Sequence, residues 1–123
     1  MFQYAAGKSL AESLHTELKL YIKEIEVRGR HNGFELSRIF HVNAEVAKPS
    51  DAKQVLGLRS NDRLIKLIKS RKLDLIRGSR YIVEKTFHFQ PALLKAKNNS
   101  FIRGYWKSEK YFLNHTDLIR SEF

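Results

Sequence analysis

Apolar residues recur every four positions near the start of the chain. The series consists of Phe2, Ala6, Leu10 and Leu14. This spacing places them along one side of a helix, so the pattern predicts a helix over residues 2–15. Gly7 lies inside that helix, where glycine costs about 1 kcal/mol relative to alanine. We therefore expect Gly7 to allow close packing against a sheet.

Three shorter segments carry the pattern of β-strands. Leu18–Ile22 alternates apolar and amphipathic residues with a period of two. Tyr81–Val83 and Phe101–Trp106 are rich in β-branched and aromatic residues, which strands favour. A helix followed closely by a strand is half of an α/β unit. The predicted fold class is therefore α/β.

Further helices are predicted in the middle and at the end of the chain. One begins at Pro49, with Ser50 as its cap and Asp51 favourable in the first turn. The others are a basic helix near Asp62–Leu73, a turn or short helix over Pro91–Leu94, and a last helix near Thr116–Phe123 capped by Asn114 or Thr116.

The predicted elements are too few for a complete layered domain. About three short strands are fewer than most sheets contain. The first helix has no preceding strand to cover, and the last helix has no strand after it. We therefore expect a domain truncated at both ends. Its first helix is expected to expose its apolar stripe and to promote self-association.

Charge is the unusual feature of the composition. The 123 residues carry a formal net charge of +10. Between Arg59 and Arg80, eight cations stand against two acids, a local surplus of 8 − 2 = +6. This segment is either a solvated helix face or a contact with an anionic surface, and peripheral contact with a membrane stays open. Its cations are not interleaved with aromatic residues, so nucleic acid is not expected as a partner.

Several kinds of chemistry have no support in the sequence. There is no cysteine, and the five histidines are scattered without metal-ligand spacing, so no metal or other cofactor is expected. The start of the chain lacks the features of a secretory signal, and no run of about 18 apolar residues occurs. The expected location is the cytoplasm, and peripheral association with a membrane is the alternative.

Two strings resemble glycosyltransferase family 11, the α-1,2-fucosyltransferases. The string Met1–Gly7 resembles the segment that follows the family's glycine-rich turn. Gly104–Phe112, which reads GYWKSEKYF, resembles the family's GYWQSEKYF block, with Lys107 in place of glutamine. Shorter strings between them occur in the family's order, so the resemblance runs along the whole chain.

The resemblance implies both a fold and a reaction. Residues 1–123 would form a partial, Rossmann-like, N-terminal (acceptor-side) domain of a GT-B glycosyltransferase, with the C-terminal donor-binding domain absent. A galactoside 2-α-L-fucosyltransferase moves fucose from GDP-fucose to the 2-hydroxyl of a galactoside with inversion, without a metal. The glycine-rich turn and the arginine-rich donor block of the family are missing here, so the isolated chain is expected to be inactive. The alternatives are a small basic nucleic-acid-binding module and an inactive folded remnant.

Four residues are candidates for substrate contact, and the catalytic base stays unknown. Tyr105 and Trp106 would either stack on a sugar or belong to the core. Glu109 would either orient a hydroxyl or be a surface neighbour of Lys110. Gln3 would either line the nucleotide cleft or simply begin the first helix.

Overall fold

The computed structural model describes residues 1–22, 35–40, 42, 44–57 and 80–123. Its α-helices are α1 (Phe2–Ser13), α3 (Leu36–Ile39), α4 (Pro49–Leu56) and α6 (Thr116–Glu122). Short 3-10 helices are η3 (Leu93–Lys95), η4 (Glu109–Tyr111) and η5 (Leu113–His115). The strands are β1 (Lys19–Leu20), β2 (Glu45–Val46), β3 (Tyr81–Val83) and β4 (Phe101–Arg103).

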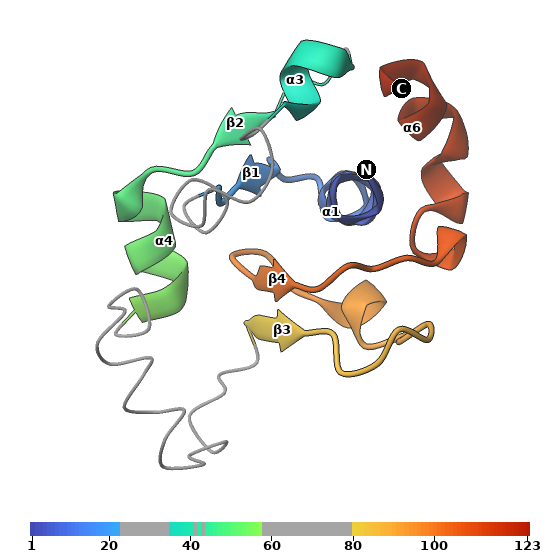
Figure 1. Ribbon diagram of the computed structural model, residues 1–123. Helices are drawn as coiled ribbons and strands as arrows, with labels where there is room; N and C mark the ends of the chain where they lie inside the picture. The colour runs from blue at the N-terminus through green and yellow to red at the C-terminus, as the bar shows by residue number, and fades with distance from the viewer. Residues whose placement is uncertain (23–34, 41, 43, 58–79) are drawn as a thin grey trace.

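The strands form two parallel pairs. Strand β1 pairs with β2, and Leu20 lies opposite Val46. Strand β3 pairs with β4, and Ile82 lies opposite Ile102. In Figure 1 the β3–β4 pair lies below the β1–β2 pair, and α1 is seen end-on beside them. The described chain is therefore a small mixed helix/strand fold with short parallel sheets, and a Rossmann-like GT-B fold stays a prediction.

Helix α1 packs against residues from both halves of the chain. A Cβ atom built on Gly7 would lie 3.1 Å from Leu18 Cδ1 and 3.6 Å from Ile102 Cδ1. Leu18 precedes β1 and Ile102 belongs to β4. The close approach therefore agrees with the packing role predicted for this glycine.

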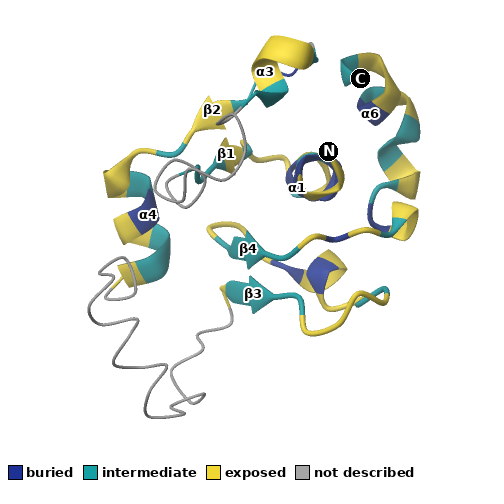
Figure 2. Cartoon of the chain, viewed as in Figure 1, coloured by how far each residue is buried: buried dark blue, intermediate teal, exposed yellow. Residues whose placement is uncertain are grey.

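The core is built from the two ends of the chain (Figure 2). Its buried members are Ala6, Leu10, Leu93, Ala96, Trp106 and Tyr111. Trp106 and Leu93 are each only 1% exposed. Because α1 supplies Ala6 and Leu10, the expectation that its apolar stripe is exposed is wrong at these positions. Self-association itself stays a prediction.

The C-terminal segment holds α1 through polar contacts as well. Lys8 Nζ lies 3.5 Å from Glu122 Oε1. Ser9 Oγ and His115 Nδ1 form a hydrogen bond of 2.9 Å. Ser9 is buried, so this Ser–His pair ties α1 to η5 instead of facing a ligand.

Several predicted elements are shorter or capped differently. The first helix ends at Ser13, and the strand expected over residues 101–106 ends at Arg103. Ser50 lies inside α4, because Lys48 is the N-cap residue and its N–H donates to Asp51 Oδ2 at 2.9 Å. The N-cap of α6 is His115, without a side-chain cap. The predicted helix near 62–73 lies outside the described residues, as does the basic segment except for Arg80. Within the described ranges, every helix is too short or too polar to cross a bilayer.

Candidate functional site

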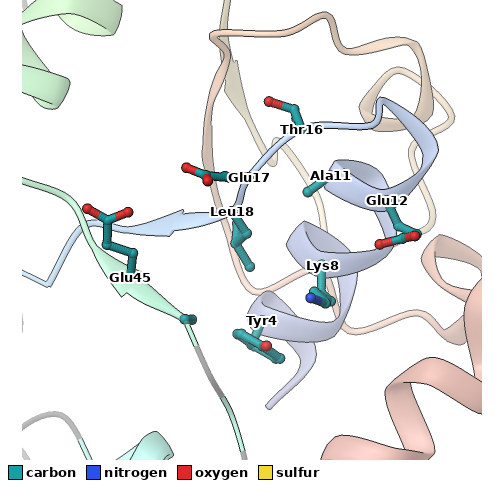
Figure 3. A pocket seen from close by; sticks show the side chains of 9 residues that line it. Tyr4, Lys8, Ala11, Glu12, Thr16, Glu17, Leu18 and Glu45 are labelled. Atoms are coloured by element: carbon teal, nitrogen blue, oxygen red, sulfur yellow. The ribbon is translucent and has the colours of Figure 1, made fainter.

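A polar cleft lies between α1 and the β1–β2 pair. We call it the α1–β1 cleft; it measures about 400 Å³. Figure 3 shows its lining side chains. They are Tyr4, Lys8, Ala11, Glu12, Thr16, Glu17, Leu18, Ala44 and Glu45. One lysine against three glutamates gives this lining a formal balance of 1 − 3 = −2, which disfavours an anionic ligand.

Two of the ionic groups in the α1–β1 cleft are already engaged. Lys8 pairs with Glu122, and Glu45 Oε1 lies 3.5 Å from Lys19 Nζ. The described residues contain no cluster of three or more acidic or histidine side chains suited to a metal ion. The described lining of this cleft therefore offers no metal-binding cluster.

A second cleft lies where β3 and β4 end. We call it the β3–β4 cleft; it measures about 270 Å³, slightly below the size of most drug-binding pockets. Its lining residues are Val83, Glu84, Lys85, Thr86, Phe87, Arg103, Gly104 and Tyr105. The parallel register places Val83 opposite Arg103, so both strands deliver their following residues to one place.

Glu84 fixes the backbone beside this cleft. Its Oε2 accepts a hydrogen bond from the N–H of Tyr105 at 2.6 Å, and its Oε1 accepts one from Trp106 at 3.1 Å. We call this arrangement the Glu84 clamp. Trp106 has a left-handed backbone, φ 50°, which costs a non-glycine residue about 1–2 kcal/mol. Hydrogen bonds to a carboxylate are among the stronger ones, and here they offset that cost.

The two neighbouring aromatic residues at the Glu84 clamp differ in exposure. Trp106 is buried in the core, whereas Tyr105 is 59% exposed. The Tyr105 ring lies 5.9 Å from that of Phe87, which is 69% exposed. Lys107 Nζ lies 5.3 Å from the centroid of the Tyr105 ring and 5.5 Å from that of Phe87. We call Phe87, Tyr105 and Lys107 the aromatic platform.

The structure brings together three of the four predicted site residues. The side-chain amide of Gln3 donates to the Gly104 carbonyl, which connects the start of α1 to the Tyr105–Trp106 segment. Of the two roles open for Trp106, the structure favours the core, because its ring is 1% exposed. Tyr105 is accessible at the β3–β4 cleft. Glu109 is exposed at the start of η4 and does not line either cleft described above.

Sequence reasoning missed Glu84 and Phe87. Glu84 is an ordinary acid at the end of a strand, and its role depends on the pairing of β3 with β4. Phe87 lies in a Phe-His-Phe string that is equally compatible with the core. Val83 and Phe87 lie four positions apart, so a period-two pattern would place both on one face and gives no signal that Phe87 is exposed while Val83 is partly buried.

Comparison with known proteins does not identify a family for this chain. No protein-family model, curated protein or solved structure matches the chain.

Proposed function

We propose that this chain is the acceptor-binding part of a galactoside 2-α-L-fucosyltransferase. The observation that carries the proposal is Tyr105, whose ring is 59% exposed at the edge of the β3–β4 cleft and whose backbone N–H is held by the Glu84 clamp. An aromatic face of this kind suits the C–H side of a pyranose. The string GYWKSEKYF, which contains Tyr105, is also the string that resembles the fucosyltransferases.

The proposed division of labour follows from the chemistry of transfer. Fucosyl transfer needs a base for the acceptor hydroxyl and cationic or N–H donors for the departing diphosphate. The clefts described here have neither a histidine nor a cluster of arginines in their linings. We therefore assign acceptor binding to the described part of this chain, and we expect the donor site outside these two clefts.

A binding experiment tests the acceptor role. Methyl β-galactoside is titrated into the ¹⁵N-labelled chain, and backbone resonances are followed by NMR. We expect shifts at Tyr105 and Gly104, a loss of at least about tenfold in affinity in Tyr105→Ala, and retention in Tyr105→Phe. Leu94→Ala, which removes a comparably exposed side chain elsewhere, is the matched control. Unchanged Tyr105 resonances at saturating sugar would refute the proposal.

An activity measurement tests the division of labour. The purified chain is incubated with GDP-fucose and lactose, and the products are separated by chromatography. We expect no fucosylated product from the chain alone. Product formed by this chain would contradict the placement of the donor site elsewhere.

A further inference from the structure

The ammonium group of Lys107 is held beside the two exposed rings of the platform. Its distances of 5.3 and 5.5 Å to the ring centroids, with 5.9 Å between the rings, describe a nearly equilateral triangle. Within the described part of the chain, no carboxylate lies close enough to Lys107 to form an ion pair. Contacts with ring faces orient a cation without neutralising its charge. Lys107 therefore carries an uncompensated positive charge next to the rings.

The adjoining cleft has the same sign of charge. Lys85 and Arg103 line it, and Glu84 is the acid among its described lining residues. Both Glu84 oxygens accept backbone N–H groups, which disperses the charge of the carboxylate. The lining has a formal balance of 2 − 1 = +1, and Lys107 raises it to +2. The α1–β1 cleft has the opposite sign, so of these two clefts among the described residues the one beside the aromatic platform is better suited to an anion.

We propose that the aromatic platform selects an acidic saccharide, a galactoside that carries a carboxylate, over its neutral counterpart. This inference rests on the proposed function and names the substrate class for it. The sugar ring packs on Tyr105 or Phe87, and its carboxylate pairs with Lys107. Lysine stands here where the resembling fucosyltransferase string has glutamine, so the charge is a feature of this chain.

A single-stranded nucleic acid also combines rings with negative charge. Proteins that bind it use several aromatic side chains along a basic groove, one for each stacked base. The platform offers one ring pair beside a cleft of about 270 Å³, which is room for one ring and not for a track. The observations therefore favour the acidic sugar.

The test compares two sugars that differ by one group. Methyl β-galactoside and methyl β-galacturonoside, its C6 carboxylate, are titrated by NMR into the wild-type chain in low and moderate salt. We expect the carboxylated sugar to bind about threefold to fivefold more tightly in low salt, as an exposed ion pair allows, and the preference to shrink as salt is added. Lys107→Gln should abolish the preference, so that the affinities for the two sugars become about equal. Lys97→Gln, which removes an equal charge from another exposed position, should retain it.

The outcomes separate this inference from the proposed function. Equal affinity of the wild type for both sugars, with both dependent on Tyr105, would overturn the inference and leave the acceptor role intact. A preference that survives in Lys107→Gln would also overturn it. Absence of binding by either sugar would overturn the acceptor role and the inference together. Oligothymidylate bound more tightly than the acidic sugar, in a manner dependent on Lys107 and Tyr105, would replace the saccharide by single-stranded nucleic acid.

Discussion

Two buried tyrosines differ in how their hydroxyl groups are satisfied. The Tyr111 hydroxyl accepts a hydrogen bond from the Gln90 N–H at 2.6 Å. The Tyr4 hydroxyl is buried without a hydrogen bond of normal geometry, and it lies beside the Glu122 carboxylate. Burial raises the pKa of Tyr4 above its ordinary value, and Glu122 adds to the effect. The buried hydroxyl group is therefore expected to destabilise the fold at Tyr4 and to stabilise it at Tyr111.

Removing these hydroxyl groups should have opposite effects on stability. Tyr4→Phe is expected to raise the free energy of unfolding by about 1 kcal/mol, because it removes an unpaired buried group. Tyr111→Phe is expected to lower it by a similar amount, because the Gln90 N–H loses its acceptor. Urea denaturation followed by circular dichroism measures both. Destabilisation by Tyr4→Phe would show that its hydroxyl is paired in solution.

Tyr4 should also make stability depend on alkaline pH. Its pKa in the folded state lies above the value of about 10 in the unfolded chain. The folded state therefore keeps its proton while the unfolded state loses it. This contribution is fully present below pH 10 and is lost as the pH rises above that value. We expect the fall in melting temperature at alkaline pH to be smaller in Tyr4→Phe than in wild type.

At the scale of elements, the segment after β4 depends on one glycine. A Cβ atom on Gly104 would lie 2.3 Å from Glu84 Cβ, a distance that forces a shift. Gly104→Ala is expected to cost about 1–3 kcal/mol and to displace the Glu84 clamp, so the resonances of Tyr105 should move. Gly57→Ala is the control: its φ of 56° is strained for alanine, but no described residue has an atom within 4 Å of the added Cβ atom. Unchanged Tyr105 resonances in Gly104→Ala would show that the clamp does not hold the ring.

The start of α4 gives a prediction at acid pH. The Lys48 N–H lowers the pKa of Asp51 below its ordinary value, and the charge of Lys19, 3.5 Å away, adds to the effect although desolvation opposes it. A depressed pKa means that Asp51 stabilises the fold above the unfolded value of about 3.9 and loses this effect as the pH falls through the folded value. An NMR titration of the Asp51 carboxyl should give a midpoint below that of Asp51 in urea. Equal midpoints in the folded and the urea-unfolded chain would contradict the predicted lowering of the Asp51 pKa.

The sequence predicted the elements better than their ends. The four-residue spacing located α1, and β-branched residues located β3, because local patterns decide both. The end of β4 depends on Gly104 fitting against Glu84, a contact across 20 positions that periodicity does not record. For the same reason the sequence left the same two roles, sugar contact or core, open for both Tyr105 and Trp106. The structure distinguishes them, because at the Glu84 clamp the Tyr105 ring is exposed and the Trp106 ring is buried.

The stability of the protein should depend on contacts between the two ends of the chain. Leu93 is 1% exposed and packs in the cluster that includes Ala6 and Trp106. Leu93→Ala is expected to lower the free energy of unfolding by about 2–5 kcal/mol. Leu94→Ala removes the same atoms from a 49% exposed neighbour and should change it by less than about 0.5 kcal/mol. Equal effects of the two changes would show that this core is not formed.

The attachment of α1 to the C-terminal segment has a consequence for biosynthesis. Tyr4 contacts Phe123 with ring centroids 5.9 Å apart, Gln3 donates to Gly104, and Figure 1 shows the two termini close together. A ribosome releases the first helix long before it adds the residues that cover Ala6 and Leu10. During that interval the nascent helix has its apolar side in water, where a chaperone that recognises short hydrophobic stretches would compete with folding.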